Sequence, residues 1–430
     1  MAKQYKSGKW SKTGRVMPGK RIEAKHIDQL LPNGEVIVVG DDQKFSPKQM
    51  KDVLKSIFND DCEEKDGRIF LKNKSETGKS ICFYTRNIIH LGGFWSSEKK
   101  RIEIGTDFPD LYRENLKNNI ETILLGIYHY FPDNIDGLTM FVCFSSETYA
   151  TRSTNNSAAH IHTIDLQNAL KYGLYRRLDK TNNELLVLNK ENFKKHIDSL
   201  RKGSELQVIK NDKELLDYFG KMYSSLPKTL IGIQCYKEMF AANADNKNQS
   251  AWEGWYIEYY VKKYLNEHPT DGIKWWSSKK KEDLDFDLKF TTEENFYGDV
   301  KSDNYKKSVQ GNKKSNIDIL IKDQNGRLWY VVFEFTPEKD SEHDNKTTIW
   351  WNTTLNADKT VRKKPKNILT YKERMKYAIH LNNLSVYEIN QFAFKYLKVF
   401  YVSPCDGKPR EPKYQIPNKM KEYLRIYQCA

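Results

Sequence analysis

The chain has 430 residues, of which 38% are hydrophobic, and its net charge of +14 favours an anionic partner, nucleic acid first, although a merely soluble basic protein would share this balance. This length suits two domains that each bury a core, and the six cysteines, which include no C-x-x-C pair, exclude a disulfide framework and a zinc ribbon. Because the first residues lack a signal-peptide core and no apolar run could span a bilayer, we expect a cytoplasmic protein without a membrane role.

Residues 1–25 make a basic segment in which lysine and arginine recur among serine and glycine, with Glu23 as the single acid. Such a flexible arm can lie along phosphates or enter a minor groove, and a solvated tail is the alternative. The pattern next predicts a set of elements typical of an α+β domain. These are a strand at 35–39, a helix from Ser46 or Pro47 to Phe58, and strands at 68–71 and 81–91.

The motif SETGKS at 75–80 is similar to the end of a phosphate-binding loop. That loop requires glycine where this chain has Asn73, and a helix where this chain continues as a strand. We therefore reject a nucleoside triphosphatase and predict a hairpin turn with Gly78 at its apex.

Residues 109–130 carry apolar side chains at mostly helical spacing and predict a helix, which a buried strand at 139–145 follows. His160 and His162 could face one way on a strand and bind a metal, but no complete ligand set accompanies them. Hydrogen bonding near a surface or base-reading loop is the alternative.

A hairpin at 174–188 and two polar helices at 190–201 and 212–223 precede a break in the pattern at 224–232. We divide the chain at this break into two expected domains, 1–225 and 226–430.

An apolar helix at 233–242 opens the second half, and the next helix begins at Ser250. Ser250 and Glu253 have capping-box spacing, which gives Glu253 a structural role at the helix start. Glu258 lies off the aromatic stripe of this helix and can point along a sheet edge toward a metal; a solvent-facing glutamate is the alternative.

Two acids and a lysine follow on two neighbouring predicted strands. Asp299 and Lys301 stand two residues apart in FYGDVKSD, so on a strand they share a face. A tight hairpin through 291–295 would bring Asp287 of LDFDLKF opposite Asp299, and Asp285 is the second choice on that strand face. Two carboxylates suit Mg²⁺, and a lysine beside them can orient or acidify an attacking water. A surface ion pair on an edge strand is the alternative.

With these residues in this order, the stretch 250–336 resembles the PD-(D/E)xK nuclease superfamily, and more narrowly its type II restriction endonucleases. In such enzymes a helix glutamate, a strand aspartate and an acid-x-lysine pair follow one another, as Glu258, Asp287 and Asp299 with Lys301 do here. The resemblance implies an α/β domain with a restriction-endonuclease-like mixed sheet flanked by helices. It also implies Mg²⁺-dependent phosphodiester cleavage, with Asp287 and Asp299 as the metal ligands. The chain departs from the commonest pattern in having Asp rather than Glu before the x-Lys, which that pattern allows.

A second stretch has a similar shape, with Asp318, a turn at Asn325 and Gly326, and then Glu334. Thr336 stands where the lysine should be, so we interpret 317–336 as the next hairpin of the same sheet.

Trp350 and Trp351 precede a run of basic residues at 359–366. This mixture suits a DNA-facing loop, and a solvated loop with packed tryptophans is the alternative. The remaining predicted elements are a helix at 371–381, a buried strand at 392–402 and a helix at 418–427.

Together these features predict a site-specific, Mg²⁺-dependent endonuclease that hydrolyses both strands of double-stranded DNA, as a restriction enzyme does. The first domain would recognise DNA or act as an effector, and two-fold cutting would favour a homodimer. Two alternatives stay open: a modification-dependent restriction endonuclease, and a non-catalytic nucleic-acid-binding protein whose acid cluster is structural.

Overall fold

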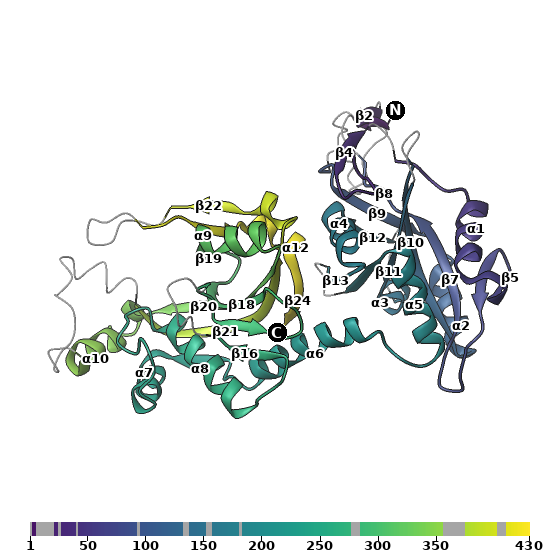
Figure 1. Ribbon diagram of the computed structural model, residues 1–430. Coiled ribbons are helices and arrows are strands. Elements are labelled where there is room, and N and C mark those ends of the chain that lie inside the picture. Colours follow the sequence, from purple (N-terminus) through teal and green to yellow (C-terminus); the bar gives the residue numbers. More distant parts are fainter. Residues whose placement is uncertain are drawn as a thin grey trace, which may run out of the picture. The chain divides into compact units, whose positions relative to one another are not determined.

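The computed structural model describes residues 2–5, 21–24, 27–39, 42–92, 95–131, 137–151, 157–179, 183–276, 284–355, 375–401 and 410–430. Contacts divide the chain into two compact units, 1–210 and 211–430, and each mixes helices with several sheets (Figure 1).

In the described part of unit 1, the main sheet has a single parallel pair, which lies at its centre. This pair is β7 (Ser80–Asn87) and β10 (Ile120–Tyr130). The flanking pairs are antiparallel. In spatial order its strands are β13 (Leu174–Leu178), β14 (Glu184–Leu188), β11 (Leu138–Phe144), β10 (Ile120–Tyr130), β7 (Ser80–Asn87), β6 (Arg68–Leu71) and β5 (Cys62–Lys65).

Helices α1 (Pro47–Phe58) and α5 (Lys190–Arg201) pack together on this sheet, and both helices have the bounds that the sequence predicted. A capping box between Ser46 and Gln49 begins α1, with proline at its first position. Met50, Leu54 and Ile57 then recur at helical spacing and enter the core. The remaining elements of unit 1 are β1 (Ala2–Tyr5), β2 (Arg21–Ala24), β3 (Ile27–Leu30), β4 (Val36–Val39), η1 (Asn59–Asp61), β8 (Ile89–His90), β9 (Lys99–Ile104), α2 (Phe108–Lys117), α3 (Ser146–Ala150), β12 (Ser157–His162) and α4 (Thr163–Tyr172).

Two predictions for unit 1 are corrected. The helix expected at 109–130 is α2 followed by the long strand β10, because Asn119 takes a left-handed backbone that ends the helix and both faces of the next strand are buried. In the basic segment, which was expected to be a flexible arm, β1 pairs with β2. The hairpin turn at Gly78 is confirmed, since β6 and β7 on either side of it are antiparallel neighbours.

Unit 2 contains the expected mixed central sheet. In spatial order its strands are β15 (Thr229–Ile231), β21 (Lys376–Ile389), β20 (Arg327–Lys339), β18 (Phe296–Asn304), β17 (Leu288–Phe290) and β16 (Ile273–Trp275). β24 (Arg425–Cys429) also pairs with β21, and β18 runs parallel to β20. A smaller sheet joins β19 (Val309–Lys313), β23 (Lys413–Ile416) and β22 (Lys398–Phe400).

Helix α8 (Trp252–Glu267) lies against β18, and α7 (Gly232–Ala241) packs on α8. Helix α6 (Gln207–Ser224) was expected before the domain boundary, but nearly all of it belongs to unit 2. Its aromatic side chains explain this, since Phe219 packs on Phe290 and Tyr223 on Phe333 of the unit 2 sheet.

Four predictions in the last third of the chain are wrong. The hairpin expected at 317–336 is absent, because the segment before β20 is α9 (Lys314–Asp318) and a π-helical turn η2 (Ile319–Asp323) instead of a strand. These turns form part of a crossover that leaves β20 parallel to β18. A helix was expected at 371–381, but the described part of this range contains the beginning of the largely buried strand β21. The strand expected at 392–402 is η4 (Ala393–Tyr396) and the largely exposed β22, and the helix expected at 418–427 is η5 (Asn418–Met420), α12 (Lys421–Leu424) and β24.

The tryptophan-containing stretch was expected to be a DNA-facing or solvated loop. Trp350 and Trp351 instead lie in α10 (Lys346–Leu355), which follows η3 (Asp340–Glu342), and the basic run at 359–366 lies outside the described residues.

Candidate functional site

The register of β17 against β18 places Asp287 beside Asp299. Leu288 pairs with Gly298, so Asp287 stands one step further along, where the described ladder between these strands ends. The free amide of Val300 donates to Asp287 Oδ2 at 2.8 Å, and the Trp276 amide donates to the Asp287 carbonyl at 2.7 Å. Asp287 is therefore fixed by two backbone donors at the open edge of β18, as the predicted hairpin required.

Asp299 and Lys301 form an ion pair along β18, and their two-residue spacing puts both side chains on one face. Asp299 is only 2% exposed, and Asn312 Nδ2 from β19 donates to its Oδ1 at 2.9 Å. Lys301 is half-buried. This pair is inside the unit, which excludes the surface ion pair that was the alternative.

Glu258 reaches the same group from α8. Gly254, one turn earlier, lies so close to β18 that a Cβ would meet Ser302 Oγ at 3.4 Å. Residues four apart share a helix face, so Glu258 also faces β18. Burial raises the pKa of Glu258 to about 7; the Lys301 ammonium opposes this rise and the Asp299 carboxylate adds to it. Glu258 is thus part of the acid cluster and is not a solvent-facing glutamate.

The pKa values of Asp287 and Lys301 depend on each other and on Asp299. Burial and then the Asp299 carboxylate raise the pKa of Asp287 to about 8, against the effect of Lys301. Burial lowers the pKa of Lys301, but the Asp299 and Asp287 carboxylates outweigh it and the net direction is upward. Lys301 therefore stays an ammonium, and the site gathers three carboxyl groups around one cation.

Neighbouring acids have other partners. Ala251, not Ser250, caps α8, so the predicted capping box is wrong; Glu253 is buried and ion-paired with Lys376. Asp285 is exposed and pairs with Lys313 Nζ at 3.4 Å. Neither belongs to the buried cluster.

The competing acids do not meet. Asp318 contacts Lys322 Nζ at 2.7 Å and the Tyr414 hydroxyl at 3.1 Å. Glu334 is 4% exposed and ion-paired with Lys421. These two acids lie in separate ion pairs.

His160 and His162 lie in different environments. His160 is exposed on β12, whereas His162 is buried with its Nδ1 3.0 Å from Arg177 Nη2. The His162 amide donates to Asp165 Oδ2 at 2.8 Å at the start of α4. These contacts match the hydrogen-bonding alternative for His162.

No group of three or more His, Cys, Asp or Glu side chains in the described part of the chain is arranged to hold a metal ion by itself. Mg²⁺ often takes only one or two protein carboxylates and completes its shell with water and substrate phosphate. Asp287 and Asp299, adjacent at an open strand edge, fit that smaller requirement.

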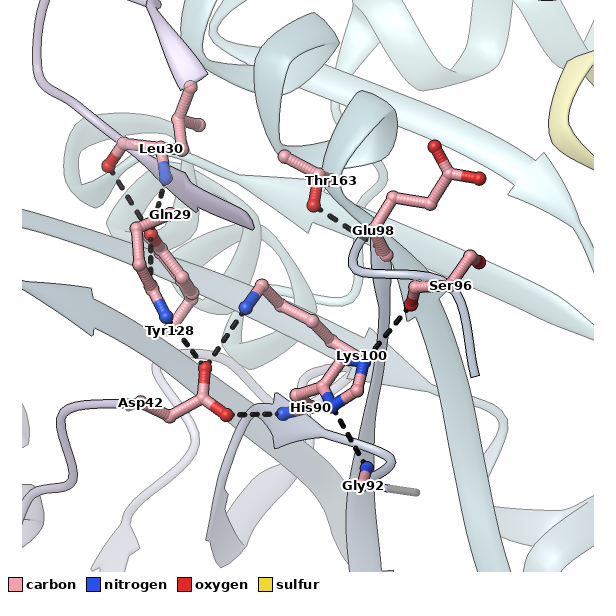
Figure 2. Close-up of polar contacts among 10 residues, drawn as sticks. All are labelled: Gln29, Leu30, Asp42, His90, Gly92, Ser96, Glu98, Lys100, Tyr128 and Thr163. Atoms are coloured by element: carbon pink, nitrogen blue, oxygen red, sulfur yellow. Dashed lines mark hydrogen bonds and ion pairs between the residues drawn. The ribbon is translucent and has the colours of Figure 1, made fainter. Parts of the chain in front are cut away.

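A buried polar cluster in unit 1 was not predicted (Figure 2). Lys100 of β9 is 0% exposed, and its Nζ lies 3.0 Å from Asp42 Oδ1. Asp42 also accepts from Gln29 Nε2 at 2.7 Å and from the His90 amide at 2.5 Å. Burial lowers the pKa of Lys100, and Asp42 opposes that change. Through these contacts Asp42 joins β3, β8 and β9, so the role of this cluster is structural.

Residues 79–197 match a family model described as Methylase-associated X1, which covers 119 of the 430 residues and includes β7, β10, β11, β13 and β14. No curated protein and no solved structure matches the chain. None of the described helices is long and apolar enough to cross a membrane.

Proposed function

We propose that unit 2 is the catalytic domain of a site-specific, Mg²⁺-dependent endonuclease that hydrolyses double-stranded DNA within a restriction-modification system. The observation that carries this proposal is the meeting of Asp287, Asp299, Lys301 and Glu258 at one strand edge. The order of these residues is the order that the PD-(D/E)xK resemblance implies, and their proximity is what a phosphodiesterase site needs. The match to a methylase-associated family supports the restriction-modification context.

The residues have distinct roles in this proposal. Asp287 and Asp299 would hold Mg²⁺, which when bound supplies positive charge to the phosphate and acidifies water. Lys301 lies against Asp299 and would orient the attacking water and stabilise charge that develops on the phosphate. As the water oxygen bonds to phosphorus, one ester oxygen departs and takes up a proton. Glu258, whose pKa is raised, can hold or release a proton beside this group.

Unit 1 would contribute DNA recognition or an effector role, and cutting both strands symmetrically would favour a homodimer. These assignments follow from the basic composition and from the separate compact unit that contains the matched family segment.

The proposal is tested by incubating the protein with unmodified and with methylated genomic DNA, with Mg²⁺ or with excess chelator. We expect mapped fragment ends at defined sequences with Mg²⁺ and no cutting with chelator. Cutting of methylated DNA alone would identify the modification-dependent enzyme. Tight DNA binding without cutting under any of these conditions would identify a non-catalytic binding protein.

A further inference from the structure

A cavity of about 760 Å³ lies beside the acid cluster in unit 2. Glu258 and Asp287 are part of its wall, so whatever fills it is adjacent to the group that would receive the phosphate. The cavity has the volume of a small-molecule or nucleotide site. Its other walls are the turn 242–246 after α7, one face of α8, and Trp275 and Trp276 at the end of β16.

One face of α8 supplies an aromatic surface next to Glu258. Trp255 and Glu258 are three residues apart and both line the cavity. Trp275 and Trp276 are already engaged, since Lys262 Nζ lies 5.9 Å from the Trp275 ring and Lys289 Nζ lies 5.2 Å from the Trp276 ring. Trp255, in contrast, is half-buried and makes no ring contact or hydrogen bond with the described residues. Among the tryptophans of the wall, Trp255 is therefore the one whose ring has no described cation or ring partner.

The charges in the wall select which part of a nucleotide can enter. The lining acids outnumber the lining lysines, and one lysine, Lys262, is paired at 3.3 Å with Asp245. The lining acids are Asp245, Glu258, Glu267, Asp285 and Asp287, and the lining lysines are Lys262 and Lys263. Away from the metal that Asp287 would hold, a phosphate would be repelled by this wall, whereas a neutral base can stack on an indole and donate its amino groups to carboxylates.

We propose that this cavity receives one nucleobase of the DNA strand, unstacked from its neighbours, while the adjoining phosphate lies at the Asp287 and Asp299 edge. This inference rests on the proposed function for the position of the phosphate. A base inside a duplex cannot enter such a cavity, so the substrate at the cut is single-stranded or has one base extruded. Trp255 is the stacking residue.

The test uses the full-length protein with Ca²⁺ in place of Mg²⁺, so that the carboxylates can hold a cation, and electrophoresis checks that the probe stays uncut. The probe is a short single-stranded oligonucleotide in which one 2-aminopurine stands between abasic nucleotides. The free base is therefore unstacked and fluorescent, and stacking on an indole quenches it. We expect quenching on binding. Trp255→Ala should remove the quenching and weaken binding at least about tenfold, the lower part of the range for losing one base–aromatic stack. Trp255→Phe should retain most of both.

Tyr401→Ala serves as the control, because Tyr401 is a highly exposed aromatic residue of unit 2 outside the cavity wall, and circular dichroism checks the fold of each variant. Unchanged quenching and affinity in Trp255→Ala would overturn the cavity proposal, even if Mg²⁺-dependent cleavage were found. Absence of oligonucleotide binding at low salt would also overturn it. Quenching that depends on Trp255 in a protein that never cuts DNA would support the base cavity and refute the nuclease.

Discussion

Asp299 is 2% exposed and lies between the side-chain amide of Asn312 and the ammonium of Lys301, so a change to either partner has a large local effect. Asp299→Asn should reduce DNA cleavage by about 10²-fold or more, because the phosphate loses a metal ligand, and Lys301→Met should have a similar effect. DNA binding should change little, since most binding contacts go to the backbone elsewhere. Cleavage rates and binding by filter retention measure both quantities.

The matched control for these variants is Glu294→Gln, which alters an exposed acid in the turn between β17 and β18, outside the cavity wall. It should cut normally. An active Asp299→Asn protein together with a folded, inactive Glu334→Gln protein would move the site to the other acids.

A second prediction concerns His196 of α5, whose pKa burial lowers to about 4. The unfolded chain has a histidine pKa of about 6.5, so between these values the unfolded state binds more protons and stability falls as the pH falls. His196 should therefore cost about 2 kcal/mol of unfolding free energy between pH 8 and pH 5. Urea unfolding at the two pH values should show that His196→Gln reduces the pH dependence by this amount. Equal pH dependence in both proteins would contradict the assignment.

The sequence predicted contacts between residues that lie close together along the chain and missed contacts between distant ones. Asp287, Asp299 and Lys301 could be placed because strand alternation and a short hairpin fix their geometry locally. Asp42 and Lys100 could not, since 58 residues separate them and neither has a distinctive motif.

At the scale of elements, the Asp42–Lys100 contact fastens the loop after β4 to β9, and His90 attaches β8 to the same carboxylate. Asp42→Asn leaves a fully buried ammonium without its counter-charge and should cost about 3–5 kcal/mol. The double variant Asp42→Asn with Lys100→Met should be far less destabilised, because both charges of the pair are removed together. Urea unfolding of the single and double variants measures this difference. Equal losses in both would show that packing, not charge, determines the stability of this contact.

Elements were mistaken where both faces of a strand are buried. β10 and β21 are buried on both faces over much of their length, which removes the alternation that identifies a strand and leaves a pattern also found in buried helices. Helices α1 and α5 were placed correctly because each has one apolar face and a side-chain cap. A segment with one apolar face can thus be assigned from its own sequence. A fully buried segment can be assigned only when the elements that pack on it are known.

At the scale of the molecule, α6 determines where an independent unit 2 can begin. Leu215, Phe219 and Met222 of this helix are at most 4% exposed. A fragment of residues 204–430 should therefore fold, whereas 227–430 should lose this packing and melt at a distinctly lower temperature or aggregate. Circular dichroism melting of the two fragments tests this. If the 227–430 fragment were as stable as the longer one, α6 would be a linker that does not stabilise unit 2.

The central sheet of unit 2 joins segments that are synthesised early and late. The edge of β21 that faces away from β20 pairs with β15 early in the unit and with β24 at residues 425–429. Asp299 and Lys301 leave the ribosome long before β20 and β21, which must add to β18 and to each other across large sequence separations. A growing chain therefore carries the β17–β18 hairpin with its acids before it has β20 and β21, which bury and support β18. The sheet that supports the candidate site is therefore complete only when residues 425–429 have been made.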